Sequence, residues 1–135
     1  MTEYMGSMQN HLFVYGTLMR GYDNPAAKLL SRDAAFCGEA RCQGRLYLVT
    51  HYPALVRSDD AGDVVFGELF SLHAAEASLA ILDDYEGCAL PQPRYLRQLL
   101  PVKREDGFIV EAWTYVYNRP VAQLKRIASG RFPEG

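Results

Sequence analysis

Three features that define special classes of protein are missing from this sequence. No stretch comes near the run of about 20 apolar residues that a membrane-spanning helix needs. The first residues have neither the basic start nor the apolar core of a secretion signal. The three cysteines form no CxxC motif and lie near no pair of histidines with zinc-ligand spacing. We therefore expect a cytoplasmic protein with reduced thiols, no metal site and no membrane partner.

An excess of positive charge is also missing. The 14 lysines and arginines are outnumbered by 16 aspartates and glutamates, which gives a net charge of −2. Lys103-Arg104 and Lys125-Arg126 are isolated pairs rather than basic tracts. Because no positive field is available to collect phosphate groups, we expect no nucleic-acid partner.

What is present is typical of one folded domain. With 135 residues, 49% of them hydrophobic and 22% charged, the chain can bury a core without disulfide or metal staples. Residues 1–10 show no periodic pattern, so we expect a loose leader there and a single domain over 11–135. No pattern in the sequence indicates an oligomeric state.

Short β-like runs make up most of this domain, separated by glycine, proline and aspartate. The expected strands cover 11–15, 35–42, 44–50, 54–57, 64–72, 95–103 and 108–118. Tyr52-Pro53 predicts a break between two of these strands, and Asp106-Gly107 predicts the turn of a hairpin.

Fewer segments have helical patterns. Asn24-Pro25 combines an N-cap with a first-turn proline and predicts a short helix over 26–31. Apolar residues spaced as one helical face predict the main helix over 73–85, which Gly87 ends. Residues 121–129 are expected to form one more helical segment. Many strands with one substantial helix indicate the α+β class, with a strongly curved or closed sheet and helices outside it.

Glu86 is the first candidate for chemistry. At about 100° per residue, Leu79 and Leu82 share one face of the main helix, and Glu86 projects onto that face. Glu76 and Asp83 fall at its margins, where solvent reaches them. Burial and the negative end of the helix dipole would both raise the pKa of Glu86, as a general acid and base requires. The alternative is that the last turn frays and Glu86 points outward to water or an arginine.

The loop Tyr15-Gly16-Thr17-Leu18, which follows the first expected strand, is the second candidate. Gly16 permits a turn that aims the N–H groups of Thr17 and Leu18 at one point, making a nest for an anion. The Thr17 hydroxyl adds another polar group. The alternative is a strand that simply ends in a tight turn.

Other reactive side chains have less support. His11, His51 and His73 are far apart and form no metal-binding motif, so surface or strand positions are expected for them. Cys88 follows Glu86 closely, but nothing in the sequence supplies a base that would activate its thiol.

Three of the nine tyrosines, Tyr52, Tyr95 and Tyr115, lie on or beside expected strands. Their hydroxyls could face a polar ligand. Packing in the core or at a rim is the alternative for each of them.

Taken together and in this order, several short motifs resemble the γ-glutamylcyclotransferase-like family. They are Phe13-Val14-Tyr15-Gly16-Thr17-Leu18, Gly21, Asn24, Gly44-Arg45-Leu46-Tyr47, Tyr52-Pro53-Ala54, Leu82-Asp83-Asp84-Tyr85-Glu86-Gly87 and Tyr95-Leu96-Arg97. The resemblance covers about residues 11–117 and is greatest to the γ-glutamylamine cyclotransferase and AIG2-like branch. Thr17 stands where members of the glutathione pathway carry serine.

The resemblance implies a fold, a reaction and a set of site residues. The implied fold is a small mixed, largely antiparallel β-barrel with flanking helices. The implied reaction closes a γ-glutamyl group into 5-oxoproline and releases an amine or amino acid, without a cofactor. The resemblance makes Glu86 the catalytic residue. It implies that the substrate is bound by Tyr15, Gly16, Thr17, Leu18 and Tyr95, with Tyr52 and Tyr115 as further wall candidates.

Two kinds of function remain open at this point. The first is a γ-glutamyl cyclotransferase of the acyltransferase or cyclising-lyase type, whose partner is a small γ-glutamyl substrate. The alternative is a module of the same fold that binds a small metabolite without converting it. A purely structural role is disfavoured, because an acidic side chain on the apolar face of the main helix would then be an uncompensated cost.

Overall fold

The computed structural model describes residues 9–133 and contains a closed barrel with the strand order β1, β5, β2, β6, β7. A separate sheet has the order β4, β3, β8. The elements are β1 (His11–Val14), α1 (Pro25–Asp33), β2 (Ala34–Gln43), β3 (Arg45–Val49), β4 (Tyr52–Val56), β5 (Val64–Leu72), α2 (Ala75–Tyr85), β6 (Tyr95–Arg104), β7 (Ile109–Tyr117) and β8 (Lys125–Arg126). Barrel neighbours are antiparallel except β1 and β7, which pair in parallel. The α+β class and the mixed, largely antiparallel barrel with flanking helices are therefore confirmed.

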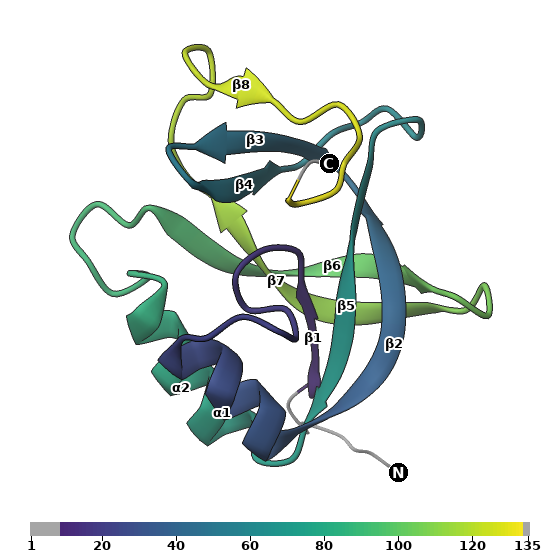
Figure 1. The fold of residues 1–135 in the computed structure, drawn as a ribbon, viewed down its shortest axis with the longest axis vertical. Helices are drawn as coiled ribbons and strands as arrows, with labels where there is room; N and C mark the ends of the chain where they lie inside the picture. The colour runs from purple at the N-terminus through teal and green to yellow at the C-terminus, as the bar shows by residue number, and fades with distance from the viewer. Residues whose placement is uncertain (1–8, 134–135) are drawn as a thin grey trace, which may run out of the picture.

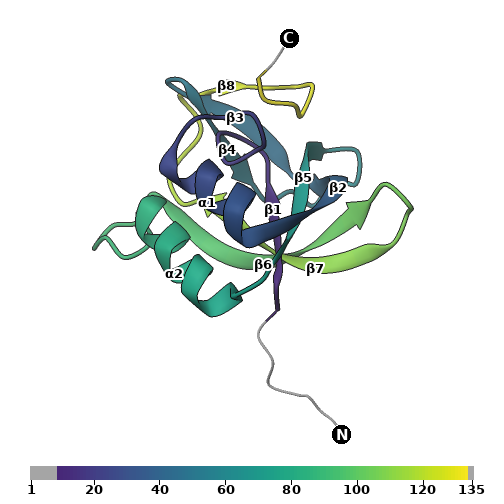
Figure 2. The ribbon, with the colours of Figure 1, turned by 60° about the horizontal axis from the view of Figure 1, so that its bottom comes forward.

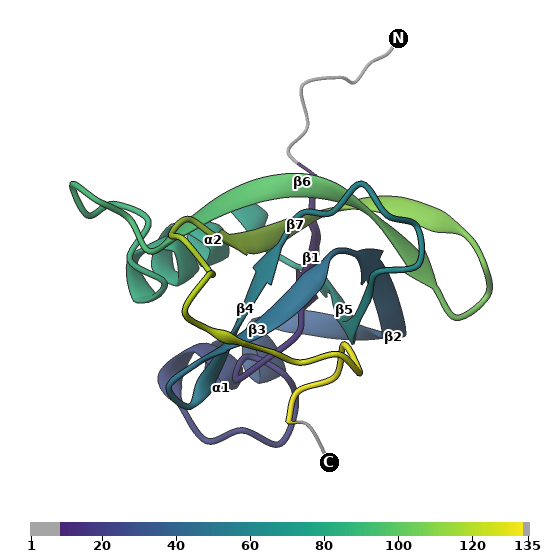
Figure 3. The ribbon, with the colours of Figure 1, turned by 90° about the horizontal axis from the view of Figure 1, so that it is seen from above.

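The two helices lie together at one end of the barrel, and the three-stranded sheet lies at the other (Figure 1). The view in Figure 2 keeps α1 beside α2, with β1 passing behind α1. Seen from above, the β6–β7 hairpin runs from the side of α2 to a tip on the opposite side (Figure 3). Within residues 9–133, neither helix is long and apolar enough to cross a membrane.

Strand β1 separates two hydrophobic clusters. Side chains alternate along a strand, so Phe13 enters the barrel interior while Leu12 and Val14 face the helices. Leu12 and Val14 join Leu30 and Leu79 in the cluster on the helix side. These four side chains and that of Phe13 are at most 2% exposed. The chain that leaves β1 therefore emerges at the boundary between the two clusters.

Local chemistry accounts for the beginning of α1 and for the end of α2. The Asn24 side chain accepts a hydrogen bond from the Ala27 N–H at 2.8 Å, as expected for an N-cap, and Pro25 occupies the first turn of α1. Helix α2 begins at Ala75 without a side-chain cap. Gly87, with φ of +76°, follows the end of α2, a backbone conformation that glycine adopts readily.

Two local expectations are wrong. Residues 121–129 form a turn and the short strand β8, because Lys125 and Arg126 pair with β3, a distant contact that local pattern does not report. Tyr52-Pro53 does not break the chain but begins β4, where Pro53 opposes Leu48. Because β4 is an edge strand, the missing N–H of Pro53 is tolerated. Of the leader expected over residues 1–10, residues 1–8 lie outside the described part of the chain, whereas the carbonyl of Gln9 accepts a hydrogen bond from Trp113.

Candidate active site

A cavity of about 370 Å³ opens where β1 ends. The loop after β1, the start of β4, the end of α2 and the start of β6 form its walls. All six residues singled out from the sequence line it: Tyr15, Gly16, Thr17, Leu18, Glu86 and Tyr95. The fold therefore brings together segments that are more than 60 residues apart in the chain.

The loop over residues 15–18 is held in a fixed shape. The Met19 N–H donates to the Gly16 carbonyl at 3.0 Å, and the Asn24 side chain donates to the Thr17 carbonyl at 2.8 Å. Gly16 lies so close to β4 that a Cβ there would be 2.5 Å from Cγ of Pro53, so a larger residue would force the two walls apart. No group among residues 9–133 accepts a hydrogen bond from the N–H of Thr17 or Leu18, which leaves both donors available to a ligand.

Glu86 lies immediately after α2, and its backbone N–H donates to the Leu82 carbonyl at 2.9 Å. The side chain is half-buried and has no ion-pair or hydrogen-bond partner within the described part of the chain. Burial raises the pKa of Glu86 to about 7, although the nearby Arg94 guanidinium opposes the shift. At neutral pH this carboxyl group can both accept and return a proton.

Asp83, one turn earlier, is reached by solvent as expected, with its side chain 26% exposed, but it also has partners that were not predicted. Its carboxylate receives two hydrogen bonds from Arg97, at 2.7 and 3.0 Å, and one from the Tyr115 hydroxyl at 2.7 Å. The Arg97 guanidinium also stacks over the Trp113 ring, 4.2 Å from its centroid. Strands β6 and β7 bring these partners alongside α2, which helical periodicity alone cannot indicate. The result is that the end of the helix carrying Glu86 is fastened to the barrel.

The tyrosines line the cavity with rings whose hydroxyls are already engaged. The Tyr15 hydroxyl donates to the Tyr115 carbonyl at 2.6 Å and accepts from the Leu55 N–H at 3.3 Å. The Tyr95 hydroxyl donates to the Pro53 carbonyl at 2.8 Å. Burial raises the pKa of both Tyr15 and Tyr95 well above the ordinary value, so the phenols stay protonated. These residues join the barrel to the three-stranded sheet and offer ring surface rather than acid or base groups.

Cys88 is unsuited to act as a nucleophile. Burial, together with the carboxylates of Asp83 and Glu86, raises the pKa of its thiol to about 11. The thiolate is therefore scarce at neutral pH. Among the described residues no group of His, Cys, Asp and Glu side chains could hold a metal ion.

Two residues at the rim of the cavity, His51 and Arg94, have no chemical role predicted from the sequence, whereas Tyr52 is one of the predicted wall candidates. His51, Tyr52 and Arg94 all line it, and Arg94 donates a hydrogen bond to the Tyr52 hydroxyl at 2.9 Å. His51 was expected only as a surface or strand histidine, and Arg94 belongs to no motif. Their convergence depends on the β3–β4 turn meeting the segment before β6, a tertiary contact without a sequence signature.

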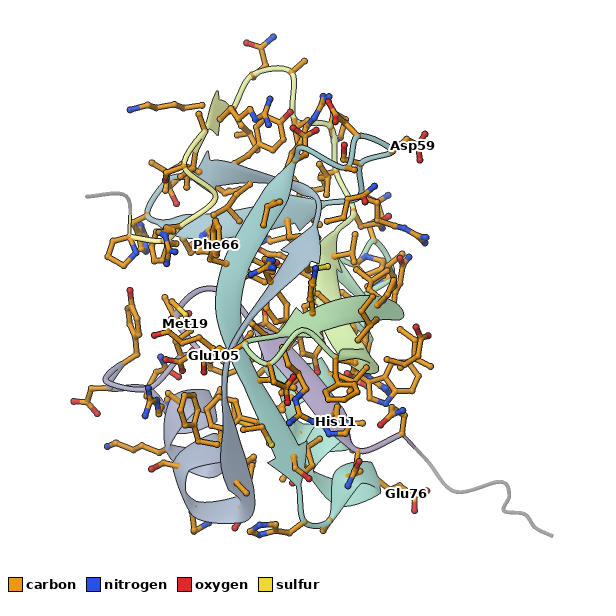
Figure 4. The ribbon with its side chains drawn as sticks, turned by 90° about the vertical axis from the view of Figure 1, so that its right-hand side faces the viewer. His11, Met19, Asp59, Phe66, Glu76 and Glu105 are labelled. Atoms are coloured by element: carbon orange, nitrogen blue, oxygen red, sulfur yellow. The ribbon has the colours of Figure 1, made fainter. Side chains whose placement is uncertain are left out.

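A second hollow, of about 530 Å³, lies on another face and has different chemistry. Met19, Phe66 and Glu105 line it and are labelled on that face in Figure 4. Two of the three glutamates in its lining are already engaged: Glu105 accepts from the Glu39 N–H at 3.2 Å, and Glu68 pairs with Arg20 at 3.4 Å. It contains none of the residues proposed from the sequence, so the cavity beside β1 is the candidate active site.

Comparisons with known proteins agree with this architecture. Residues 12–134 match the sequence model of the family described as gamma-glutamyl cyclotransferase, AIG2-like. YtfP of Escherichia coli K12, a gamma-glutamylcyclotransferase family protein, is 32% identical over 120 residues, covering 88% of this chain and 92% of YtfP. The solution structure of YtfP matches with a TM-score of 0.66.

Two further relatives have related sequences and folds. The crystal structure of an AIG2-like protein from Mus musculus matches with a TM-score of 0.67 and 32% identity, over 84% of this chain and 80% of that one. YkqA of Bacillus subtilis, a putative gamma-glutamylcyclotransferase, is 27% identical over 128 residues. That alignment covers 94% of this chain but 42% of YkqA, so the chain spans about two fifths of that relative's length.

Proposed function

The chain belongs to the gamma-glutamyl cyclotransferase, AIG2-like family, and from this we propose that it converts γ-glutamyl amines or γ-glutamyl amino acids to 5-oxoproline and the free amine. One observation carries the proposal. Glu86, whose pKa is raised to about 7, lines the same cavity as the N–H groups of Thr17 and Leu18, and neither the carboxyl group nor these two donors have a partner among residues 9–133. The cavity thus contains a proton carrier and a place for the oxygens of a substrate.

The chemistry requires proton transfers that a single carboxyl group can perform. Ionised Glu86 removes a proton from the α-ammonium group of the substrate, and the freed amine attacks the γ-carbonyl carbon. The new carbon–nitrogen bond closes a five-membered ring. The bond to the departing nitrogen then breaks, and that nitrogen takes the proton from Glu86. Glu86, ionised again, then passes the second proton of the ring nitrogen to the freed amine. The amide nitrogen of 5-oxoproline keeps one proton, the amine leaves as an ammonium ion, and Glu86 ends in its ionised form, so no other reactant is consumed.

Because nucleophile and electrophile belong to one molecule, the protein's main task is to hold the substrate folded. Proximity of this kind can contribute several kcal/mol, roughly 7–11 in well-oriented intramolecular reactions. We assign that task to the loop over residues 15–18, where the N–H groups of Thr17 and Leu18 would bind oxygens of the glutamyl group. The buried rings of Tyr15 and Tyr95 would close the wall and limit access of water.

The direct test is to measure 5-oxoproline release from a panel of γ-glutamyl amines and amino acids. We expect Glu86→Gln to lower kcat by about 10²- to 10⁴-fold, because the amide keeps the shape but cannot carry a proton. Glu76→Gln is the matched control, since Glu76 is exposed on the same helix and does not line the cavity (Figure 4). Undiminished turnover in Glu86→Gln would refute the assigned role. Tight binding of a γ-glutamyl compound without conversion of any member of the panel would favour the binding module.

A further inference from the structure

The position of the departing group in the cavity follows from the proposed function, on which this inference rests. If the loop over residues 15–18 binds the glutamyl group, that group lies against buried residues, since Tyr15 and Leu18 are each 6% exposed. The amide to be broken must also reach Glu86. The departing amine then extends toward the exposed part of the lining, which consists of His51, Arg94 and their neighbours.

Arg94 is the strongest charge at this rim. Its side chain is exposed, and the ion pairs found among residues 9–133 do not include it. Of the ten other arginines, six have a carboxylate within ion-pair distance, and four resemble Arg94 in having none among the described residues. Arg94 is the arginine among these that lines the cavity. Its guanidinium group therefore has donors left for a ligand.

Tyr52 fixes the position of this charge. Arg94 Nη1 donates to the Tyr52 hydroxyl at 2.9 Å, and Arg94 Cζ lies 5.8 Å from the centroid of the Tyr52 ring. Tyr52 is in turn part of β4, beside the Pro53 that contacts Gly16. A guanidinium group held at one nitrogen still has N–H donors on its other two nitrogens, and these suit a carboxylate.

We infer that Arg94, positioned by Tyr52, binds a carboxylate on the departing group, so that the protein prefers γ-glutamyl amino acids to γ-glutamyl amines without such a carboxylate. Among the described residues, the other ionisable side chains of the lining are Glu86, His51 and the tyrosines, so Arg94 is the permanent positive charge there. A substrate whose departing end is negative therefore meets an attractive charge at the rim. A departing end that carries an ammonium group meets a repulsive one.

The test compares γ-glutamylalanine with γ-glutamylalaninamide, two substrates of nearly equal shape that differ in one negative charge. For the unaltered protein we expect kcat/KM to be about tenfold higher for γ-glutamylalanine, a factor typical of a charge-assisted hydrogen bond weakened by solvent. Arg94→Gln should bring the ratio close to one, and Arg94→Lys should keep part of it. Arg41→Gln, which removes an arginine outside the cavity, controls for net charge and should keep the full ratio.

The ratio separates this idea from two others. Arg94→Gln also alters the charge near Glu86, but that change affects both substrates and cancels in the ratio. An equal loss for both substrates would mean that Arg94 binds the glutamyl group or acts only through Glu86, and it would overturn the inference. A ratio near one in the unaltered protein would do the same.

Calorimetric binding to Glu86→Gln protein supplies a readout that does not depend on turnover. Tighter binding of γ-glutamylalanine than of the alaninamide, lost on adding Arg94→Gln, would support the rim selection even if no compound were converted. Absence of conversion by the unaltered protein would count against the proposed function alone. Equal dissociation constants for the two compounds would count against the rim selection alone.

Discussion

Asp63 and Glu86 are acidic residues in two regions whose surroundings have opposite effects on a negative charge. Asp63, beside the start of β5, accepts hydrogen bonds from Arg45 at 2.6 Å, Ser58 at 2.6 Å and Arg126 at 2.8 Å. These hydrogen bonds hold the pKa of Asp63 well below its usual range, and the bond from Ser58 has the largest effect. Glu86 has no comparable partner among the described residues, and burial raises its pKa to about 7.

The difference shows how one fold can hold one carboxyl group permanently ionised and leave another able to change its protonation near neutral pH. Arg45 and Arg126 belong to β3 and β8, so Asp63 fastens the three-stranded sheet to the barrel. A permanently ionised group is suited to that task. Glu86 has no such stabilising partners among the described residues, and for this reason its carboxyl group can gain and lose a proton near neutral pH.

The largest expected effect is on the pH dependence of activity. Since Glu86 must be ionised to act as a base, kcat/KM should rise with pH and level off above about 7. Below that value it should fall about tenfold per pH unit, or roughly a hundredfold by pH 5. Initial rates of 5-oxoproline release between pH 5 and 8 check this, with circular dichroism to confirm that the fold persists. A flat profile between pH 5 and 7 would contradict the assignment.

The next largest effect is expected on stability, for the substitution Asp63→Asn, which removes the charge of the structural carboxylate. We expect Asp63→Asn to lower the thermal unfolding midpoint at pH 7 while kcat stays unchanged at temperatures where the variant is folded. The pKa of Asp63 is lowered on folding, so its contribution is complete above the unfolded value of 3.8 and is lost as the pH falls toward the folded one. The deficit should therefore shrink in acid. Asp59→Asn, at an exposed position nearby, should leave the midpoint unchanged (Figure 4).

Glu86→Gln is expected to change stability in the opposite direction, so that this variant is more stable than the unaltered protein. Because the pKa of Glu86 rises on folding from 4.5 to about 7, the folded state binds more protons between these values and stability falls as pH increases. At pH 8 we expect the variant to be more stable by about 1–3 kcal/mol, as measured by urea denaturation. At pH 4 Glu86 is largely neutral in the folded and the unfolded state, so the difference in stability between the variant and the unaltered protein should largely vanish. A less stable variant at pH 8 would show that the Glu86 carboxylate is favourably paired in solution.

The smallest effect is expected for Arg94, whose positive charge opposes the rise in the pKa of Glu86. Arg94 lowers the pKa of Glu86, so Arg94→Gln should move the limb of the pH profile to higher pH for every substrate. Arg41→Gln, outside the cavity, should leave the limb in place. A shift toward lower pH would mean that the guanidinium group does not act on Glu86 as the geometry indicates.

Much of the fold is encoded locally, which explains what the sequence predicts. Strand β1, the N-cap at Asn24 and the β6–β7 hairpin each follow from neighbouring residues, and the structure has all three. The projection of Glu86 onto the Leu82 face also agrees with its place in the cavity lining. Its catalytic role remains a prediction.

What the sequence does not predict depends on contacts between distant segments. β8 exists because Lys125 and Arg126 meet β3, and the same segment has no strand-like alternation by itself. Asp83 is a structural anchor only because β6 and β7 bring Arg97 and Tyr115 beside it. No motif contains Arg94, so its place at the rim became visible only in three dimensions.

The cavity has walls from two different sheets, and this has a consequence for how such proteins can diversify. Glu86 and the loop over residues 15–18 belong to the barrel and its helix, whereas His51 and Tyr52 belong to the β3–β4 hairpin of the other sheet. Under the proposed function, changes in the hairpin that move Tyr52 would also move Arg94, which donates to it, and so would alter which departing group is accepted while Glu86 keeps its place at the end of α2.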